Sequence, residues 1–256
     1  MSMLLRTTLV RGTGLFVLLA AHLAVVLHFF PAFQEQKSAL LKLAELAGGV
    51  LASDAALASK TEWGFFSSQQ FFKLANTLGA GAGVVFAAGA VAGETQRGTL
   101  EIYLARPVSR ARLFVERYLA GALALVVPIV ASSALFESIA GWTGVEVRTT
   151  NLQMVRAALY QSAFVMMFYA AAYAVSVFAT RALSVVLGLL FFTIGMYALY
   201  LVPEANAWSI FQWTDVETFV SLEKRWATPW QFARPLLVTA ALTTIAWVGF
   251  RRRLPY

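Results

Sequence analysis

The chain contains no cysteine, and this absence excludes several kinds of site. Its 256 residues offer no thiol for disulfides, iron–sulfur clusters or thiolate-bound zinc, and only two histidines for other metal or haem ligation. Charged residues are also scarce, at 13%, whereas hydrophobic residues reach 59% and the mean hydropathy is +0.69. Soluble domains carry roughly 45–50% apolar and about 25% charged residues. We therefore expect a membrane protein without metal or redox chemistry.

Long uncharged runs recur along the chain, and a run of about 18 or more apolar residues is long enough to cross a bilayer. The uncharged runs are Gly12 to Phe33, Tyr118 to Phe136, Ala157 to Thr180 and Ala182 to Val202. Two further runs depart slightly from the pattern: Phe71 to Gly93 has Lys73 near its start, and Pro235 to Phe250 is short unless Phe232 and Ala233 extend it. The pattern predicts an all-α membrane protein with six transmembrane helices. We expect residues 1–256 to form a single membrane domain, because no separate soluble unit is visible between the runs.

The distribution of charge predicts how these helices are oriented. With a cytoplasmic N-terminus, the inner segments hold 11 arginines and three glutamates, a net charge of +8, and the outer segments hold a net charge of −1. Positively charged loops stay on the cytoplasmic side. We therefore predict cytoplasmic N- and C-termini, in the inner membrane of a bacterium. This placement accounts for the net charge of +7 without a nucleic-acid partner.

Three segments outside the runs have patterns of their own. Residues 1–11 combine the apolar side chains of Leu4, Leu5, Leu9 and Val10 with two arginines, which is typical of a short helix lying in the membrane plane. Residues 34–70 predict an amphipathic helix on the outer side, interrupted near Gly48 and Gly49. Residues 203–230 form a second outer segment, which is apolar enough to dip back toward the membrane.

The inner loop between the second and third runs, residues 94–110, is the most informative segment. Thr99 is a good N-cap, Pro107 disfavours helix at Arg106, and Ser109 can cap the next helix. The apolar face of the expected helix consists of Leu100, Tyr103 and Leu104. The result is a rigid cytoplasmic helix, over residues 99–106, on which a soluble partner could push.

This loop resembles that of the permease subunits of ABC-2 type transporters, which typically reads GE-x-x-x-GTLE-x-LL-x-x-P-x-SR. The matching residues are Gly93, Glu94, Gly98, Thr99, Leu100, Glu101, Leu104, Pro107, Ser109 and Arg110. Tyr103 stands where the family often has a second leucine, and Arg117 stands where a lysine commonly opens the third span. Within the family, the sequence is most similar to the branch named for multicopper-enzyme maturation.

The resemblance implies a type V exporter-like fold in which two permeases, here a homodimer, form the membrane pathway. Separate cytoplasmic ATPases would hold the ATP and Mg²⁺, and this chain would be no enzyme, since it lacks the motif G-x-x-x-x-G-K-[ST]. The loop would be the coupling helix, and its site residues would be Glu94, Arg97, Gly98, Thr99, Leu100, Glu101, Tyr103, Leu104, Pro107 and Arg110. Glu94 and Arg97 could pair with each other or with charges on the ATPase.

A stripe of hydroxyl groups on the fourth run is the candidate transport pathway. Its members, seven, four, three and four residues apart, are Ser162, Tyr169, Tyr173, Ser176 and Thr180. Such a stripe lines a pathway or bonds to a neighbouring helix, and the spacing alone leaves both interpretations open. Because the runs hold almost no charge, an amphipathic or lipid-like cargo is expected. The alternative function is a scaffold that passes ATPase motion to a periplasmic partner without transporting anything.

Overall fold

The computed structural model describes residues 3–47, 49–104 and 109–252, and within these ranges it contains helices and no strand. Among the described residues, six helical segments are long and apolar enough to cross a membrane. They are Arg6–Ala39, Glu62–Ala90, Arg110–Ala134, Asn151–Phe178, Ala182–Leu201 and Pro229–Arg252. The predicted all-α fold with six spans is confirmed.

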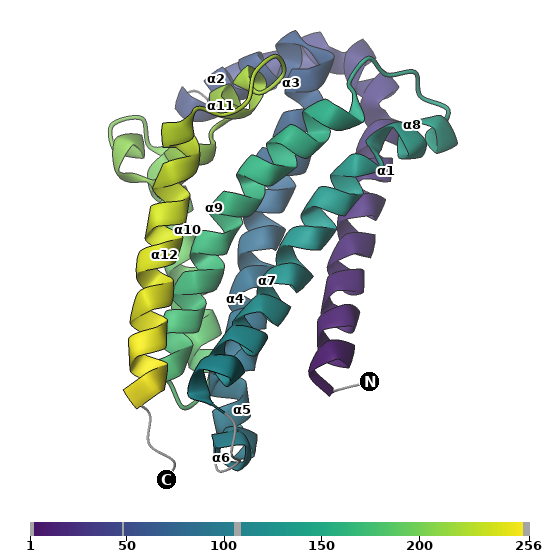
Figure 1. The fold of residues 1–256 in the computed structure, drawn as a ribbon. Helices are drawn as coiled ribbons and strands as arrows, with labels where there is room; N and C mark the ends of the chain where they lie inside the picture. Colours follow the sequence, from purple (N-terminus) through teal and green to yellow (C-terminus); the bar gives the residue numbers. More distant parts are fainter. Residues whose placement is uncertain (1–2, 48, 105–108, 253–256) are drawn as a thin grey trace.

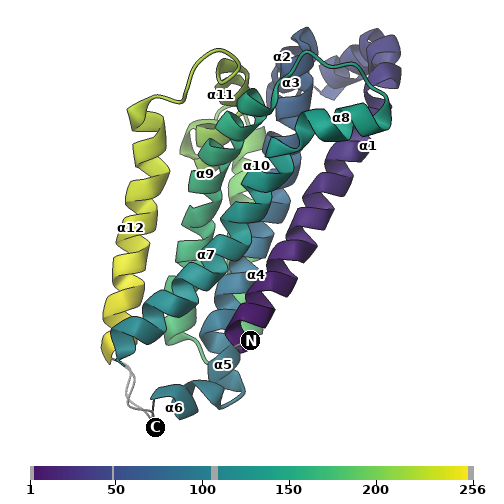
Figure 2. The same ribbon diagram turned by 45° about the vertical axis from the view of Figure 1, so that its right-hand side comes forward.

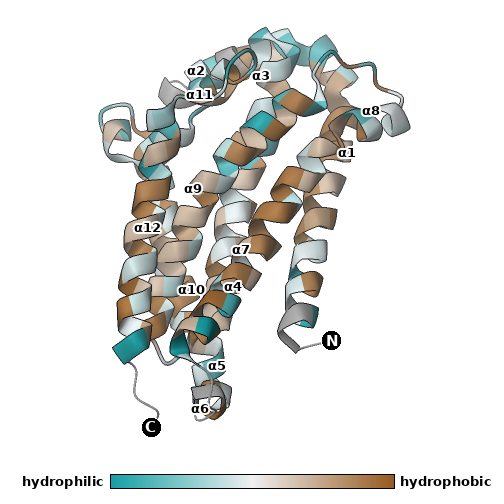
Figure 3. Cartoon of the chain, in the orientation of Figure 1, coloured by the Kyte–Doolittle hydropathy of each residue, from teal (hydrophilic) through white to brown (hydrophobic). Residues whose placement is uncertain are grey.

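The spans form one upright bundle with a different structure at each end (Figures 1 and 2). Both described chain ends lie at the end that carries α5 (Ala92–Gln96) and α6 (Thr99–Leu104), which we call the α6 end. The opposite end, which we call the α2 end, is covered by short helices: α2 (Gly49–Lys60), α3 (Glu62–Ser67), α8 (Phe136–Thr143) and α11 (Val216–Ser221). Apolar residues dominate the middle of the bundle and polar residues its two ends (Figure 3).

The helix α9 (Asn151–Phe178) is the core of the bundle. In its most apolar stretch 78% of the residues are buried, compared with 6% in α10 (Ala182–Leu201) and 11% in α12 (Pro229–Arg252). Its N-terminus is fixed by a capping box between Thr150 and Gln153. The helices α4 (Ala80–Ala90), α7 (Arg110–Ala134) and α12 pack around it, so that α10 and α12 present most of their apolar surface to the outside.

The second span changes helix type along its length. Between α3 and α4 lies the π-helix η1 (Ser68–Gly79), which is rare in proteins at this length. Its polar side chains bond to other spans: Gln161 donates to the Asn76 side-chain oxygen at 2.7 Å, and Gln70 contacts His22 at 3.1 Å. The π-helical stretch thus coincides with hydrogen bonds between polar side chains inside the bundle. The sequence pattern predicts neither the π-helix nor these bonds.

The prediction of a separate in-plane helix at residues 1–11 is wrong. The helix α1 runs without a break over Met3–Ala47, so the described part of that segment continues the first span. No proline stands between Met3 and Phe30 to interrupt it. Arg6 and Arg11 lie in its first turns, where long side chains can reach polar groups from inside an apolar helix.

The two predicted outer segments both lie at the α2 end. The helix α1 ends at Ala47 and α2 begins at Gly49, while Gly48 lies outside the described residues. The later segment contains η2 (Asn206–Trp208), η3 (Ile210–Thr214) and α11. It is fastened to the bundle, since Phe211 and Phe219 are buried and the Trp63 indole donates to the Phe219 carbonyl at 3.0 Å.

Candidate functional site

The link between the second and third spans is a folded segment. The helix α5 continues from α4 after a break at Val91, and Gly98 then turns the chain into α6. Gly98 has a φ of +67°, a left-handed conformation that glycine adopts without steric penalty, and its N–H donates to the Thr95 carbonyl at 2.9 Å. The direction of α6 therefore depends on this glycine, and we call residues 92–104 the α5–α6 segment.

One face of α6 points into the protein and the other outward. Leu100 is buried, whereas Ile102 is 58% exposed. The helix is described as far as Leu104, and Pro107, predicted to end it, lies outside the described residues. The next helix, α7, begins with the predicted cap: the Ser109 hydroxyl accepts the Arg112 N–H at 3.2 Å.

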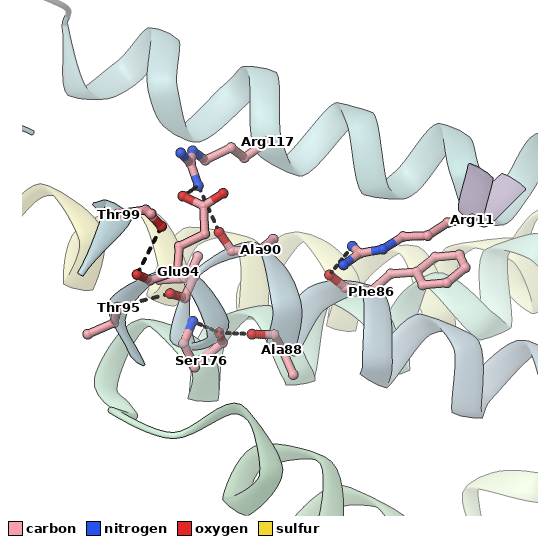
Figure 4. A network of polar contacts seen from close by, with 11 residues as sticks. Arg11, Phe86, Ala88, Ala90, Glu94, Thr95, Thr99, Arg117 and Ser176 are labelled. Atoms are coloured by element: carbon pink, nitrogen blue, oxygen red, sulfur yellow. Dashed lines mark hydrogen bonds and ion pairs between the residues drawn. The ribbon is translucent and has the colours of Figure 1, made fainter. Parts of the chain in front are cut away.

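Thr99 does not act as the predicted N-cap. It is the first residue of α6, and its hydroxyl donates to the Glu94 carbonyl at 3.2 Å (Figure 4). The left-handed turn at Gly98 brings this hydroxyl back over α5, away from the free N–H groups of its own first turn. Thr99 therefore ties α6 to α5 rather than capping α6.

The predicted pairing of Glu94 with Arg97 is replaced by an ion pair across two spans. The Glu94 carboxylate pairs with the Arg117 guanidinium of α7, which also donates to the Ala90 carbonyl at 3.0 Å (Figure 4). The side chains of Arg117 and Glu94 are only 5% and 19% exposed, whereas Arg97 at the end of α5 is exposed. The ends of the second and third spans are thus joined by charge in a protected place.

Two further contacts fix α5 to the rest of the bundle. The Ser176 hydroxyl of α9 accepts the Ala92 N–H at 2.8 Å, which satisfies a donor freed by the break at Val91 (Figure 4). The Gln96 side chain accepts the Ala182 N–H at 3.3 Å, at the start of α10. A displacement of α5 must therefore act on α7, α9 and α10 together.

The first helix reaches the same region through Arg11. Its guanidinium donates to the Phe86 carbonyl of α4 at 3.4 Å and lies 5.5 Å from the centre of the Phe86 ring (Figure 4). Gly89 leaves room for it, since a Cβ there would lie 2.8 Å from an Arg11 nitrogen. In the sequence, Arg11 falls within the predicted in-plane helix, and Arg117 is distinguished only by standing where the family commonly has a lysine. A cation expected at position 117 in this family is the sequence feature that could have identified Arg117 as the partner of Glu94.

Four of the five predicted pathway residues are buried within the protein. Ser162 donates to the Ala158 carbonyl at 2.7 Å, and the Tyr169 hydroxyl donates to the Tyr118 carbonyl of α7 at 2.9 Å. Tyr173 packs edge-on against Phe114 and Tyr118, and Ser176 binds the α4–α5 junction. Only Thr180 is exposed, beside a hollow at the α6 end. Within the chain Tyr169, Tyr173 and Ser176 therefore contact neighbouring helices, as the second of the two interpretations predicts, whereas the Ser162 bond stays within α9.

Comparison with known proteins agrees with this architecture. Residues 1–235 match a family model described as "ABC-2 family transporter protein". The match includes the α5–α6 segment and the first five spans. A search of curated proteins finds no match.

Proposed function

Because this chain belongs to the ABC-2 transporter family, we propose that it is a permease subunit driven by a separate cytoplasmic ATPase through the α5–α6 segment. The observation that carries the proposal is the buried Glu94–Arg117 ion pair beneath an outward-facing α6. A surface helix linked in this way to two spans is suited to receive a push from a soluble partner and to pass it into the membrane.

The proposed orientation places the α6 end in the cytoplasm. This end carries the arginine-rich segments, and positively charged loops are retained on the cytoplasmic side. We propose the inner membrane of a bacterium as the location and a second copy of the chain as the other half of the pathway. The amphipathic or lipid-like cargo remains part of the proposal, supported by the scarcity of charge in the spans.

Transmission would begin at α6 and follow the contacts of α5. Movement of α6 pulls on Glu94 through the Thr99 hydroxyl, and Glu94 is paired with Arg117 on α7. The bond from Ser176 brings α9 into the same unit. Since α9 is the buried centre of the bundle, its displacement rearranges the packing of several spans at once.

The test is assembly with the ATPase and stimulation of ATP hydrolysis in native membranes. Ile102→Asp places a charge on the exposed face of α6, and we expect it to abolish co-purification of an ATPase. The matched control is Leu46→Asp, which alters an 84% exposed leucine at the α2 end and should leave assembly intact. An ATPase that binds and responds equally to both variants would contradict the proposal.

The scaffold function remains the alternative, and exposed indoles at the α2 end favour it. Trp142 and Trp208 are each 81% exposed there, beside short helices that could hold a periplasmic protein. Cross-linking from Trp208 distinguishes the two functions. A specific periplasmic protein, together with ATPase activity that no added amphiphile changes, would favour the scaffold over the transporter.

A further inference from the structure

A hollow at the α6 end lies between α5, α9 and α12, and the proposed coupling assigns it no ligand. Its volume is about 930 Å³, which is in the range of sites for small organic ligands. Its polar lining consists of Thr95, Gln96, Thr180, Arg181, Thr244 and Arg252. Among the described residues that line it, none is acidic, so the hollow favours an anion.

The opposite wall of the hollow is apolar and open toward the membrane region. Phe178 at the end of α9 is 68% exposed, and Ile245 of α12 is 52% exposed. Both lie within or at the end of membrane-crossing segments, where exposed apolar side chains face hydrocarbon. A single ligand could therefore place an anionic group near Arg181 and Arg252 and a hydrocarbon chain along this apolar wall.

Two of the helices that line the hollow, α9 and α12, approach each other closely beside it. A Cβ at Gly249 would lie 2.5 Å from the Phe178 ring and 3.1 Å from Val177, so that only glycine lets α12 come this near to α9. The polar rim of the hollow includes Gln96, whose bond to the Ala182 N–H makes α5 part of the wall.

We infer that this pocket binds an anionic phospholipid, with its phosphate between Arg181 and Arg252 and an acyl chain against Phe178 and Ile245. Basic pockets between membrane helices on the cytoplasmic side are suited to anionic headgroups. Arg181 precedes α10 and Arg252 ends α12, so the phosphate would join the two spans with the smallest shares of buried residues. The inference deepens the proposed function, because the ligand would contact α5 directly.

The test uses the full chain, purified in neutral detergent without an ATPase, so that its outcome does not depend on coupling. Phosphatidylglycerol, phosphatidylcholine and inorganic phosphate are each titrated, and bound lipid is counted by native mass spectrometry. We expect one saturable phosphatidylglycerol per chain, bound at least about tenfold more tightly than phosphatidylcholine. Inorganic phosphate should not displace it at equal concentration.

Two kinds of variant distinguish lipid binding in the pocket from nonspecific electrostatic attraction of anionic lipid to the basic surface. Arg181→Gln combined with Arg252→Gln should weaken phosphatidylglycerol binding about tenfold or more. Arg251→Gln, which removes the same charge next to the pocket but outside its lining, should not. Thr244→Trp fills the pocket and leaves both arginines in place, and it should also abolish saturable binding.

Three results would overturn the inference. Equal binding of phosphatidylglycerol and phosphatidylcholine would show that the negative charge of the headgroup does not determine binding. Displacement of the lipid by inorganic phosphate would show that its acyl chain contributes nothing to binding. Unchanged binding in Thr244→Trp would place the lipid elsewhere on the basic surface. Helix content and the melting temperature of each variant show that the comparison concerns folded protein.

Discussion

Arg117 of α7 holds Glu94 of α5 in an ion pair and also binds the carbonyl of Ala90, so that one guanidinium joins three successive features of the chain: the end of α4, the start of α5 and the third span. A surface ion pair contributes little to stability. This one is protected from water, and losing either member leaves a buried charge without its partner.

Breaking this pair should destabilise the protein strongly. Glu94→Gln or Arg117→Gln is expected to cost about 3–5 kcal/mol, and the double variant Glu94→Gln with Arg117→Met should recover part of that loss, because it leaves no unpaired charge. Thermal unfolding in detergent measures the effect.

A matched control exists on the same helix. Arg112 and Glu116 form an ion pair at 2.6 Å, but their side chains are 72% and 47% exposed. Arg112→Gln should leave the melting temperature unchanged. A similar loss for Arg112→Gln and Arg117→Gln would show that protection from water is not what makes the buried pair important.

The turn at Gly98 should matter for coupling beyond its effect on stability. Gly98→Ala forces an L-residue into a left-handed conformation, at a cost of about 1–2 kcal/mol, and the chain can relieve this strain by redirecting α6. We expect weaker ATPase stimulation. Gly144 has a φ of +72° at the α2 end, so Gly144→Ala imposes the same strain far from α6 and should leave stimulation intact. Equal loss in both variants would contradict the role of α6.

The contact between α7 and α9 should tolerate no side chain at Gly121. A Cβ there would lie 2.9 Å from the buried ring of Tyr169, whose hydroxyl is held by the Tyr118 carbonyl. Gly121→Ala should therefore destabilise the bundle by about 1–3 kcal/mol. Gly81→Ala meets open space and should be neutral or slightly stabilising, since alanine favours helix. Denaturation of the two variants side by side tests the prediction.

The α2 end should become less stable as the pH rises through the range 4 to 6. Burial, aided by the nearby Asp215, raises the pKa of Asp54 from 3.8 to about 6, against the opposing effects of the Tyr200 hydrogen bond and Lys73. Because the folded state holds this proton more tightly than the unfolded state, the associated stability is present at low pH and is lost above about pH 6.

Asp54→Asn removes the charge and should abolish this part of the pH dependence, with a higher melting temperature than the parent protein at pH 8. The hydrogen bond from the Tyr200 hydroxyl, 2.8 Å long, can be retained by the amide oxygen. Glu45→Gln, at an exposed position of α1, serves as the control and should preserve the pH dependence. An unchanged pH profile in Asp54→Asn would assign the effect to another group.

The spans were predictable because each is a long apolar run, and such a run has one stable state in a bilayer. The cap at Ser109 was predictable for a similar reason, since it depends only on residues three positions apart. Local rules therefore sufficed for the helices and for part of the loop.

The remaining features depend on how helices meet. The partner of Glu94 lies 23 positions along the chain, on another span, and the π-helix η1 pairs Asn76 with a glutamine of α9. The buried hydroxyl stripe was recognised as a stripe, but only the neighbouring helices show that Tyr169 and Ser176 bond to them. Spacing within one helix carries no information about the identity of its neighbour.

The most direct test of the central claim is cross-linking from α6, and the absence of cysteine from the chain makes it clean. Ile102→Cys introduces a single thiol on the exposed face of α6, and Leu46→Cys introduces one at the α2 end. A thiol-directed cross-linker in native membranes, followed by mass spectrometry, should join Ile102→Cys to a cytoplasmic ATPase and should not join Leu46→Cys to one. An ATPase captured from Leu46→Cys and not from Ile102→Cys would contradict both the orientation and the coupling role of the α5–α6 segment.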